Sequence, residues 1–281
     1  MLKLRMIKSM WGMTGSTAEK LSRIAEAGYD GVEDGLPPPG QETEFRDLLA
    51  QHRLEYIPMI FTQGPDHRSS YASLVKRAAG FKPRVITAHS GRDSMDLSEQ
   101  IDFFKFTQKA DRDAGTGVVA HETHRGRALF TPWNTAQVLR ELPDLRINAD
   151  FSHWCCVAES LLEDCEAELA LACQRAIHIH GRVGYAEGPQ VSDPRLPEFS
   201  EALSQHQAWW KQILLQHQSR GESSLSFTPE FGPVPYMQAL RYGPAEEARL
   251  WEICLWMADD FRKFFESESH APAAARTLPR P

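Results

Sequence analysis

Acidic and histidine side chains recur along the sequence, and each falls near the end of a short run of apolar residues. They are Glu33, His89, Glu122, His124, Asp150, His178, His180 and Glu230. Carboxylate and imidazole groups bind divalent metal ions, and they also transfer protons. If the fold brings the ends of these runs together, the sequence predicts one site in which several such groups converge.

The apolar runs are typical of buried parallel strands, and they alternate with longer amphipathic segments. Eight strands are expected, at 4–10, 29–33, 54–61, 84–89, 117–124, 145–151, 176–180 and 224–230. Eight helices are expected near 16–27, 41–52, 67–79, 96–114, 133–141, 157–174, 197–219 and 244–266. Ser16 and Glu19 have the spacing of a capping box at the start of the first helix.

This alternation predicts a single α/β domain over residues 1–266, a (β/α)8 TIM barrel. An open doubly wound sheet is the rival architecture, but no GxGxxG motif follows the first strand. Residues 267–281 are rich in proline and alanine and are expected to be a disordered tail. Residues 181–197 form a long connection rich in glycine and proline. They are expected to cover the barrel mouth as a lid, with Gly181, Gly184 and Gly188 as hinge points.

In a barrel the carboxyl ends of all strands meet on one face, so the acidic groups would converge there. Alternate residues of a strand point inward, so Glu122 and His124 share a face, as do His178 and His180. Carboxylates buried in a barrel mouth cost several kcal/mol unless they are paired or bound to a cation. We therefore expect one divalent metal ion, with Mn²⁺, Mg²⁺, Co²⁺ or Zn²⁺ suited to oxygen ligands and one imidazole. His178 could instead be a hydrogen-bonded core histidine.

The barrel layout and these strand-end residues resemble the xylose isomerase-like superfamily. The residues that carry the likeness are Glu122, the pair Asp150 and His153, His180 and Glu230. The superfamily includes sugar isomerases and epimerases, inosose dehydratase, 3-dehydroshikimate dehydratase and apurinic endonucleases. The resemblance implies that Glu122, Asp150, His180 and Glu230 are the metal ligands, with Glu122 and Glu230 also the acid and base.

The same resemblance implies that His153 contacts substrate, and Arg182 is placed to hold a hydroxyl or carboxylate. His178 is the alternative ligand from the seventh strand. The full set of residues expected to bind substrate is His153, Arg182, His89, His178, Glu33 and Trp11. A metal that chelates a hydroxyl and a neighbouring carbonyl acidifies the carbon between them, which suits a keto-sugar isomerase or epimerase. A lyase or dehydratase acting on a keto-sugar, keto-glycoside or keto-cyclitol could use the same site.

Composition and charge narrow the class of partner to a small molecule, a sugar or sugar derivative. The formal net charge of −7 argues against nucleic acid, which needs a basic footprint. An apurinic endonuclease would need further histidines, whereas the second strand ends in Glu33 and residues 181–197 contain no Asp-x-His.

There is no long apolar run and no signal-like start, and the five cysteines form no CxxC pair. We expect a cytoplasmic protein with no membrane contact, and a homo-oligomer is compatible with the sequence.

Overall fold

The computed structural model describes residues 2–239 and 242–270. Its parallel strands form one closed barrel in which each strand pairs with the next along the chain and β8 pairs with β1. The eight strands are β1 (Lys3–Ser9), β2 (Gly31–Gly35), β3 (Glu55–Phe61), β4 (Ile86–His89), β5 (Val119–Glu122), β6 (Ile147–Ala149), β7 (Ala176–His180) and β8 (Ser224–Thr228). The predicted (β/α)8 barrel is confirmed.

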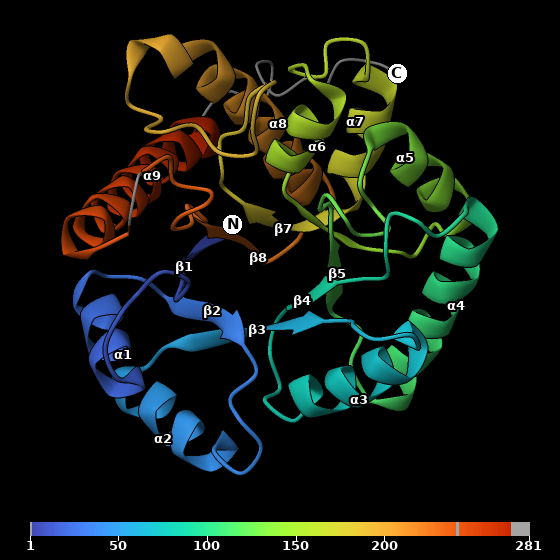
Figure 1. Cartoon of the computed structure of the whole chain (residues 1–281), viewed down its shortest axis with the longest axis horizontal. Coiled ribbons are helices and arrows are strands. Elements are labelled where there is room, and N and C mark those ends of the chain that lie inside the picture. Colours follow the sequence, from blue (N-terminus) through green and yellow to red (C-terminus); the bar gives the residue numbers. More distant parts are fainter. Residues whose placement is uncertain (1, 240–241, 271–281) are drawn as a thin grey trace.

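Helices surround the strands on all sides (Figure 1). Those in the described part of the chain are α1 (Thr17–Glu26), α2 (Glu42–His52), α3 (His67–Ala79), α4 (Leu97–Asp113), α5 (Pro132–Glu141), α6 (Ser152–Ala158), α7 (Glu166–Arg175), α8 (Ser200–Ser219) and α9 (Pro244–His270), with a 3-10 turn at Pro197–Phe199. The predicted capping box of α1 is present. The Ser16 hydroxyl accepts a hydrogen bond from the Glu19 amide, and the Glu19 carboxylate accepts one from the Ser16 amide at 2.8 Å.

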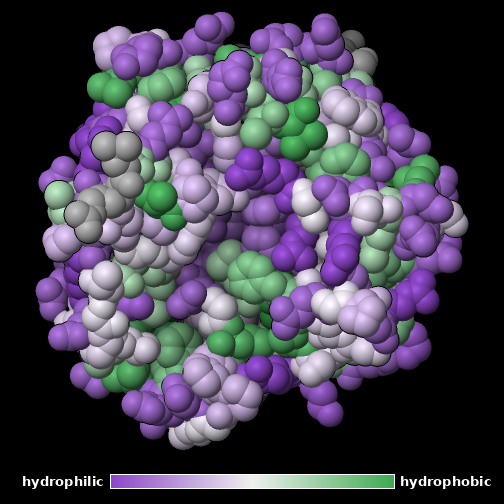
Figure 2. Space-filling model, viewed as in Figure 1, coloured by the Kyte–Doolittle hydropathy of each residue, from purple (hydrophilic) through white to green (hydrophobic). Residues whose placement is uncertain are grey.

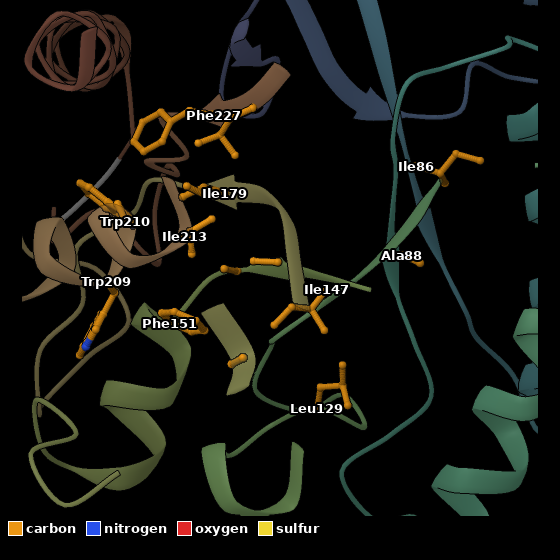
Figure 3. Packing of buried hydrophobic residues seen from close by; sticks show 14 of the residues in the cluster. Ile86, Ala88, Leu129, Ile147, Phe151, Ile179, Trp209, Trp210, Ile213 and Phe227 are labelled. Atoms are coloured by element: carbon orange, nitrogen blue, oxygen red, sulfur yellow. The ribbon is translucent and has the colours of Figure 1, made fainter. Parts of the chain in front are cut away.

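The core lies between the outer face of the strands and the helices. Figure 3 shows Trp210 and Ile213 of α8 beside Ile179 of β7 and Phe227 of β8. The Phe227 ring also stacks on Phe261 of α9, with ring centroids 3.7 Å apart. A Cβ atom on Gly181 would lie 1.9 Å from the Phe227 ring, so only glycine fits directly after β7. The packing of the core thus fixes the backbone at the end of the strand that carries His178 and His180.

Several boundaries differ from the predicted ones, and three of these differences are the most informative. The helix expected at 157–174 is two helices, α6 and α7, because Glu159 and Leu162 adopt positive φ angles of 49° and 62°. The last helix continues to His270, so the expected tail begins with helical residues, and 271–281 lie outside the described residues. β2 continues beyond Glu33 to Gly35.

No helix in the described ranges is long and apolar enough to cross a membrane.

Candidate metal centre

Four side chains from four neighbouring strands meet inside the carboxyl-terminal end of the barrel. Glu122 ends β5 and His180 ends β7, while Asp150 follows β6 directly and Glu230 lies two residues beyond β8. Each offers one ligand atom that lies within 4.8 Å of those of the other three, and all four residues are buried. The structure therefore brings together the four residues that the sequence predicted as metal ligands. We call this set the upper cluster.

Several polar atoms of the upper cluster have no hydrogen-bond partner among the described residues. They include both carboxylate oxygens of Glu122, Nδ1 of His180 and Nε2 of the neighbouring His89. His180 Nδ1 lies 2.9 Å from Glu230 Oε2 and 3.7 Å from Glu122 Oε2, without hydrogen-bonding geometry. A buried polar atom without a partner costs about 1–3 kcal/mol, so such a group calls for a specific reason. Carboxylate oxygens and an imidazole nitrogen that face one another fit a divalent cation.

Arg182 lies beside the upper cluster and contacts two of its carboxylates. Its Nη2 atom is 2.8 Å from Asp150 Oδ2 and 2.5 Å from Glu230 Oε2. Burial alone would lower the pKa of Arg182, but these two carboxylates raise it above its ordinary value. Burial also raises the pKa of Asp150, which Arg182 opposes. One guanidinium therefore contacts the carboxylates of both Asp150 and Glu230, and Glu122 has no arginine or lysine within ion-pair distance among the described residues.

The imidazoles partly compensate Glu122. Burial alone would raise the pKa of Glu122, but His89 and His180 lower it well below its ordinary value. Burial alone would lower the pKa of His180, but Glu230, Glu33 and Glu122 raise it well above the ordinary value. The two shifts have opposite signs because each group lies beside the opposite charge: the imidazoles stabilise the Glu122 carboxylate, and the carboxylates stabilise protonated His180.

Below the upper cluster lies a second group of inward-facing polar side chains, Glu33, Thr87, His178 and Thr228, which we call the lower layer. Glu33 accepts hydrogen bonds from both threonine hydroxyls at 2.6 Å and contacts His178 Nε2 at 3.2 Å. Its fourth contact is His180 Nε2, at 3.1 Å. Because Nε2 of His180 faces Glu33, Nδ1 is the nitrogen that faces the upper cluster. A carboxylate bonded to the far nitrogen of a ligating histidine is a common device that fixes the ring and its tautomer.

This placement changes the interpretation of two residues expected to bind substrate. Glu33 and His178 are fully buried beneath His180 and do not line the cavity described below. Both nitrogens of His178 already face partners, because Nδ1 lies 2.7 Å from Ser226 Oγ. His180 is therefore the seventh-strand histidine in the upper cluster, and His178 is a hydrogen-bonded core histidine.

A cavity of about 370 Å³ lies over the upper cluster, and Figure 2 shows the hollow in this face of the barrel. Glu122, Glu230 and Arg182 line its base. Apolar side chains, also part of the lining, are Trp11, Met59, Phe61 and Tyr236. Trp11 packs edge to face on Tyr236, with centroids 5.0 Å apart. The size and mixed lining suit a small polar ligand with apolar faces.

Of the histidines expected to bind substrate, His89 lines the cavity and His153 does not. His89 lines the cavity and stacks on Phe61, with ring centroids 4.3 Å apart. His153 is fully buried behind the cavity lining, with Nε2 3.6 Å from Asp150 Oδ2 and 4.0 Å from Glu122 Oε1. Burial and the neighbouring His124 hold the pKa of His153 well below its ordinary value. His153 therefore faces the upper cluster as a neutral ring.

Sequence reasoning missed Asp34, Arg127 and Tyr236, which all line the cavity. Asp34 directly follows Glu33 in β2, so the strand-end rule could have found it had the end of β2 been placed correctly. Arg127 and Tyr236 lie in loops after β5 and β8, where no periodicity marks the residues that face inward. His89 and His124 also form a further group of potential ligands with Glu122.

The connection from Gly181 to Pro197 is packed against the barrel. The Val191 amide donates to the Val183 carbonyl at 2.9 Å, and the Gln190 side chain makes two hydrogen bonds with the backbone of Gly232. Gly184 also lies close to its neighbour, since a Cβ atom there would be 2.6 Å from the Ser152 carbonyl oxygen, and neither Gly181 nor Gly184 has a positive φ angle. Both are close-packing positions in this conformation, and their role as hinges stays a prediction. Whether the loop excludes water from the site stays a prediction.

The fold and these contacts define a (β/α)8 barrel with a buried candidate metal centre at its carboxyl-terminal mouth. No protein-family model matches the sequence, and no curated protein matches it either. Solved structures do match. The probable 3-DHS dehydratase AsbF from Bacillus anthracis is 16% identical with a TM-score of 0.60, over 93% of this chain and 99% of that chain.

Two further structures share the fold. A D-tagatose 3-epimerase-like protein is 13% identical with a TM-score of 0.60, over 94% of this chain and 98% of that chain. A putative xylose isomerase from Rhodospirillum rubrum ATCC 11170 is 9% identical with a TM-score of 0.60, over 92% of this chain and 99% of that chain. The chain therefore has the fold of the xylose isomerase-like TIM barrels.

Proposed function

We propose that this protein is a divalent-metal-dependent enzyme that moves a proton on the carbon next to a carbonyl group of a sugar or sugar derivative, as an isomerase or epimerase. The observation that carries the proposal is the upper cluster. Glu122, Asp150, His180 and Glu230 are buried together beneath a cavity, and several of their polar atoms lack partners. The shared fold with a D-tagatose 3-epimerase-like protein supports a sugar as the substrate class.

Glu122 and Glu230 are the groups to which we assign proton transfer, because both are carboxylates of the cluster that also line the cavity. The lowered pKa of Glu122 keeps its carboxylate ionised, which is the form that a general base needs. A divalent ion held by the cluster would supply stabilisation of the negative charge that develops on the substrate oxygens. Arg182 holds Asp150 and Glu230 in place, and Trp11 and Phe61 offer apolar surfaces to a sugar ring.

The geometry of proton return separates the two outcomes. When a proton removed from one carbon is returned to the neighbouring carbon, the sugar is isomerised. When the second glutamate returns the proton to the same carbon from the opposite face, that carbon is epimerised. Glu122 and Glu230 come from β5 and from beyond β8, on different sides of the cluster, which suits opposite-face transfer.

A dehydratase or lyase is the second candidate. The same proton abstraction next to a carbonyl leads to elimination when the substrate carries a leaving group on the following carbon. The shared fold with a probable 3-DHS dehydratase supports this outcome. The two candidates differ in their products, since elimination releases water or an alcohol.

Metal analysis of the purified protein combined with a substrate panel in D₂O tests the proposal. We expect about one equivalent of Mn²⁺, Mg²⁺, Co²⁺ or Zn²⁺, and deuterium incorporation next to the carbonyl of at least one ketose or keto-glycoside. Chelation should abolish the exchange, and added metal should restore it. Elimination would appear in the same spectra as an unsaturated product. Exchange that proceeds unchanged in metal-free protein contradicts the proposed role of the cluster.

A further inference from the structure

The cavity over the upper cluster holds a second arginine, Arg127, in the loop after β5. Arg127 lines the cavity together with His89, His124 and Phe61. Its Nη1 atom donates to the backbone carbonyl of Thr62 at 2.8 Å and approaches that of Gly91 at 3.5 Å. The guanidinium is therefore held by fixed backbone groups from the loops after β3 and β4, rather than extending freely into solvent.

Arg127 differs from Arg182 in its counter-charges. Arg182 is paired with Asp150 and Glu230, whereas no carboxylate lies within ion-pair distance of Arg127 in residues 2–239 and 242–270. The Nε and Nη2 groups of Arg127 likewise have no hydrogen-bond acceptor in that part of the chain. Arg127 is half-buried and lines the cavity, so the oxygens of a ligand in the cavity can accept hydrogen bonds from these donors in place of water.

A second arginine, Arg92, lies near Arg127. Burial lowers the pKa of Arg127, Glu122 of the upper cluster raises it, and Arg92 lowers it. The exposed Arg92 side chain donates to His67 Nε2 at 3.0 Å and does not neutralise its neighbour. The carboxylates of the cavity lie elsewhere in its lining, at Asp34 and in the upper cluster. The cavity thus has a cationic wall that is separate from its metal-binding base.

We propose that Arg127 binds an anionic group of the substrate, and that the substrate is therefore a sugar acid or sugar phosphate rather than a neutral sugar. This inference rests on the proposed function, because it takes the upper cluster to hold the carbonyl end of the same molecule. A guanidinium presents parallel N–H donors that match the oxygens of a carboxylate or a phosphate. An anion held at Arg127 would fix the distance between the charged end of the substrate and the carbon that reacts.

Calorimetric titration with three matched polyols tests the inference. D-glucitol is neutral, D-gluconate adds a carboxylate, and D-glucitol 6-phosphate adds a phosphate to the same carbon chain. With the metal-loaded wild-type protein we expect one of the two anions to bind about 10- to 100-fold more tightly than D-glucitol, the gain typical of a charged hydrogen bond. Whichever anion shows that gain identifies the group as carboxylate or phosphate.

Three variants assign the preference to a residue. R127Q should lose most of the preference while its affinity for D-glucitol stays within about twofold, and R127K should retain part of the preference because it keeps the charge. R92Q is the matched control, because it removes the same charge from an exposed neighbour, and it should keep the preference. Thermal unfolding of each variant shows that the fold is retained.

The inference is overturned if wild type binds the three polyols equally or not at all, if R127Q keeps the preference, or if R92Q loses it as fully as R127Q. The metal content of the same samples distinguishes this failure from failure of the proposed function. A protein that binds no metal but shows an Arg127-dependent preference for an anion would contradict the proposed function alone.

Discussion

Two layers of buried polar side chains fill the carboxyl-terminal half of the barrel, and they differ in how well they are satisfied. In the lower layer, Glu33 accepts from two threonine hydroxyls and faces two histidine nitrogens. In the upper cluster, which lies nearer the cavity, neither oxygen of Glu122 has a hydrogen-bond partner among the described residues. Both glutamates are buried and both have a pKa held well below the ordinary value against the effect of burial.

We propose that this difference separates a structural carboxylate, Glu33, from a functional one, Glu122. A fully hydrogen-bonded buried carboxylate stabilises the fold and leaves nothing free to bind a ligand. A buried carboxylate with free lone pairs costs stability, and the barrel retains that cost where a cation or a proton is to be bound. The two layers meet at His180, which faces Glu33 with Nε2 and the upper cluster with Nδ1.

The largest expected effect comes from Glu122→Gln in the upper cluster. The change keeps the shape of the side chain but removes the charge and the proton acceptor, so proton transfer should slow by about 10²- to 10⁴-fold or more. Deuterium exchange into the substrate measures this rate. The metal-free variant should remain folded, because the amide keeps the shape of the side chain, although the 2.8 Å contact of Glu122 Oε2 with His89 Nε2 loses its charge. Thermal unfolding checks that the fold is retained. Exposed Glu141→Gln is the control, and full activity in Glu122→Gln would remove Glu122 from the mechanism.

Glu33→Gln in the lower layer should act on metal affinity and on stability together. Loss of the carboxylate behind His180 should weaken metal binding by about 10- to 100-fold, as is typical of residues that orient a ligating histidine. The free energy of unfolding should fall by about 1–3 kcal/mol, because an amide cannot accept from all four partners. Metal titration and urea unfolding measure the two effects. Reduced stability with unchanged metal affinity would show that Glu33 supports the fold alone.

Asp111 on α4 offers a carboxylate outside both layers, with a single side-chain hydrogen bond from Tyr71 at 2.7 Å. Burial raises its pKa to about 6 against the opposing effect of that hydrogen bond. The stability that protonated Asp111 contributes is therefore complete below about pH 4 and lost as the pH rises through about 6, with a magnitude of about 2–3 kcal/mol. Asp111→Asn should remove this part of the pH dependence and stabilise the protein at pH 7.5.

Urea unfolding of wild type and Asp111→Asn at pH 4.5 and pH 7.5 measures the difference. If the free energy of unfolding changes equally in both proteins between the two pH values, Asp111 is ionised in the fold throughout this range. One hydrogen bond would then be enough to keep a buried carboxylate ionised, as four contacts do for Glu33.

The smallest expected effect concerns the connection that packs beside the cavity. Gln190→Ala removes two hydrogen bonds to Gly232, which we expect to lower the free energy of unfolding by about 1–2 kcal/mol and to reduce turnover by less than about tenfold. Thermal unfolding and deuterium exchange check both values, with exposed Gln137→Ala as control. A loss of turnover as large as that of Glu122→Gln would show that this connection takes part in the chemistry.

The sequence by itself determined the barrel and placed the members of the upper cluster among the residues at strand ends, and the resemblance to the xylose isomerase-like superfamily selected the four. Apolar runs of strand length alternate with amphipathic helices, and that local pattern is sufficient for a (β/α)8 fold. Glu122 and His180 stand at the ends of such runs, and parallel strands in a closed barrel bring their ends to one face. The convergence of the four predicted ligands follows from these two facts.

Only the tertiary structure decided which buried polar groups are free and which are already bonded. Glu33 resembles Glu122 in sequence, because each stands at the end of a predicted strand, yet Glu33 is bonded by side chains up to 195 residues away. Arg127 and Asp34 face the cavity because of loop and strand-end geometry that no periodicity records. Hydrogen bonds across a barrel depend on register and on the height of each residue along the axis, and these are set by long-range packing rather than by neighbouring residues.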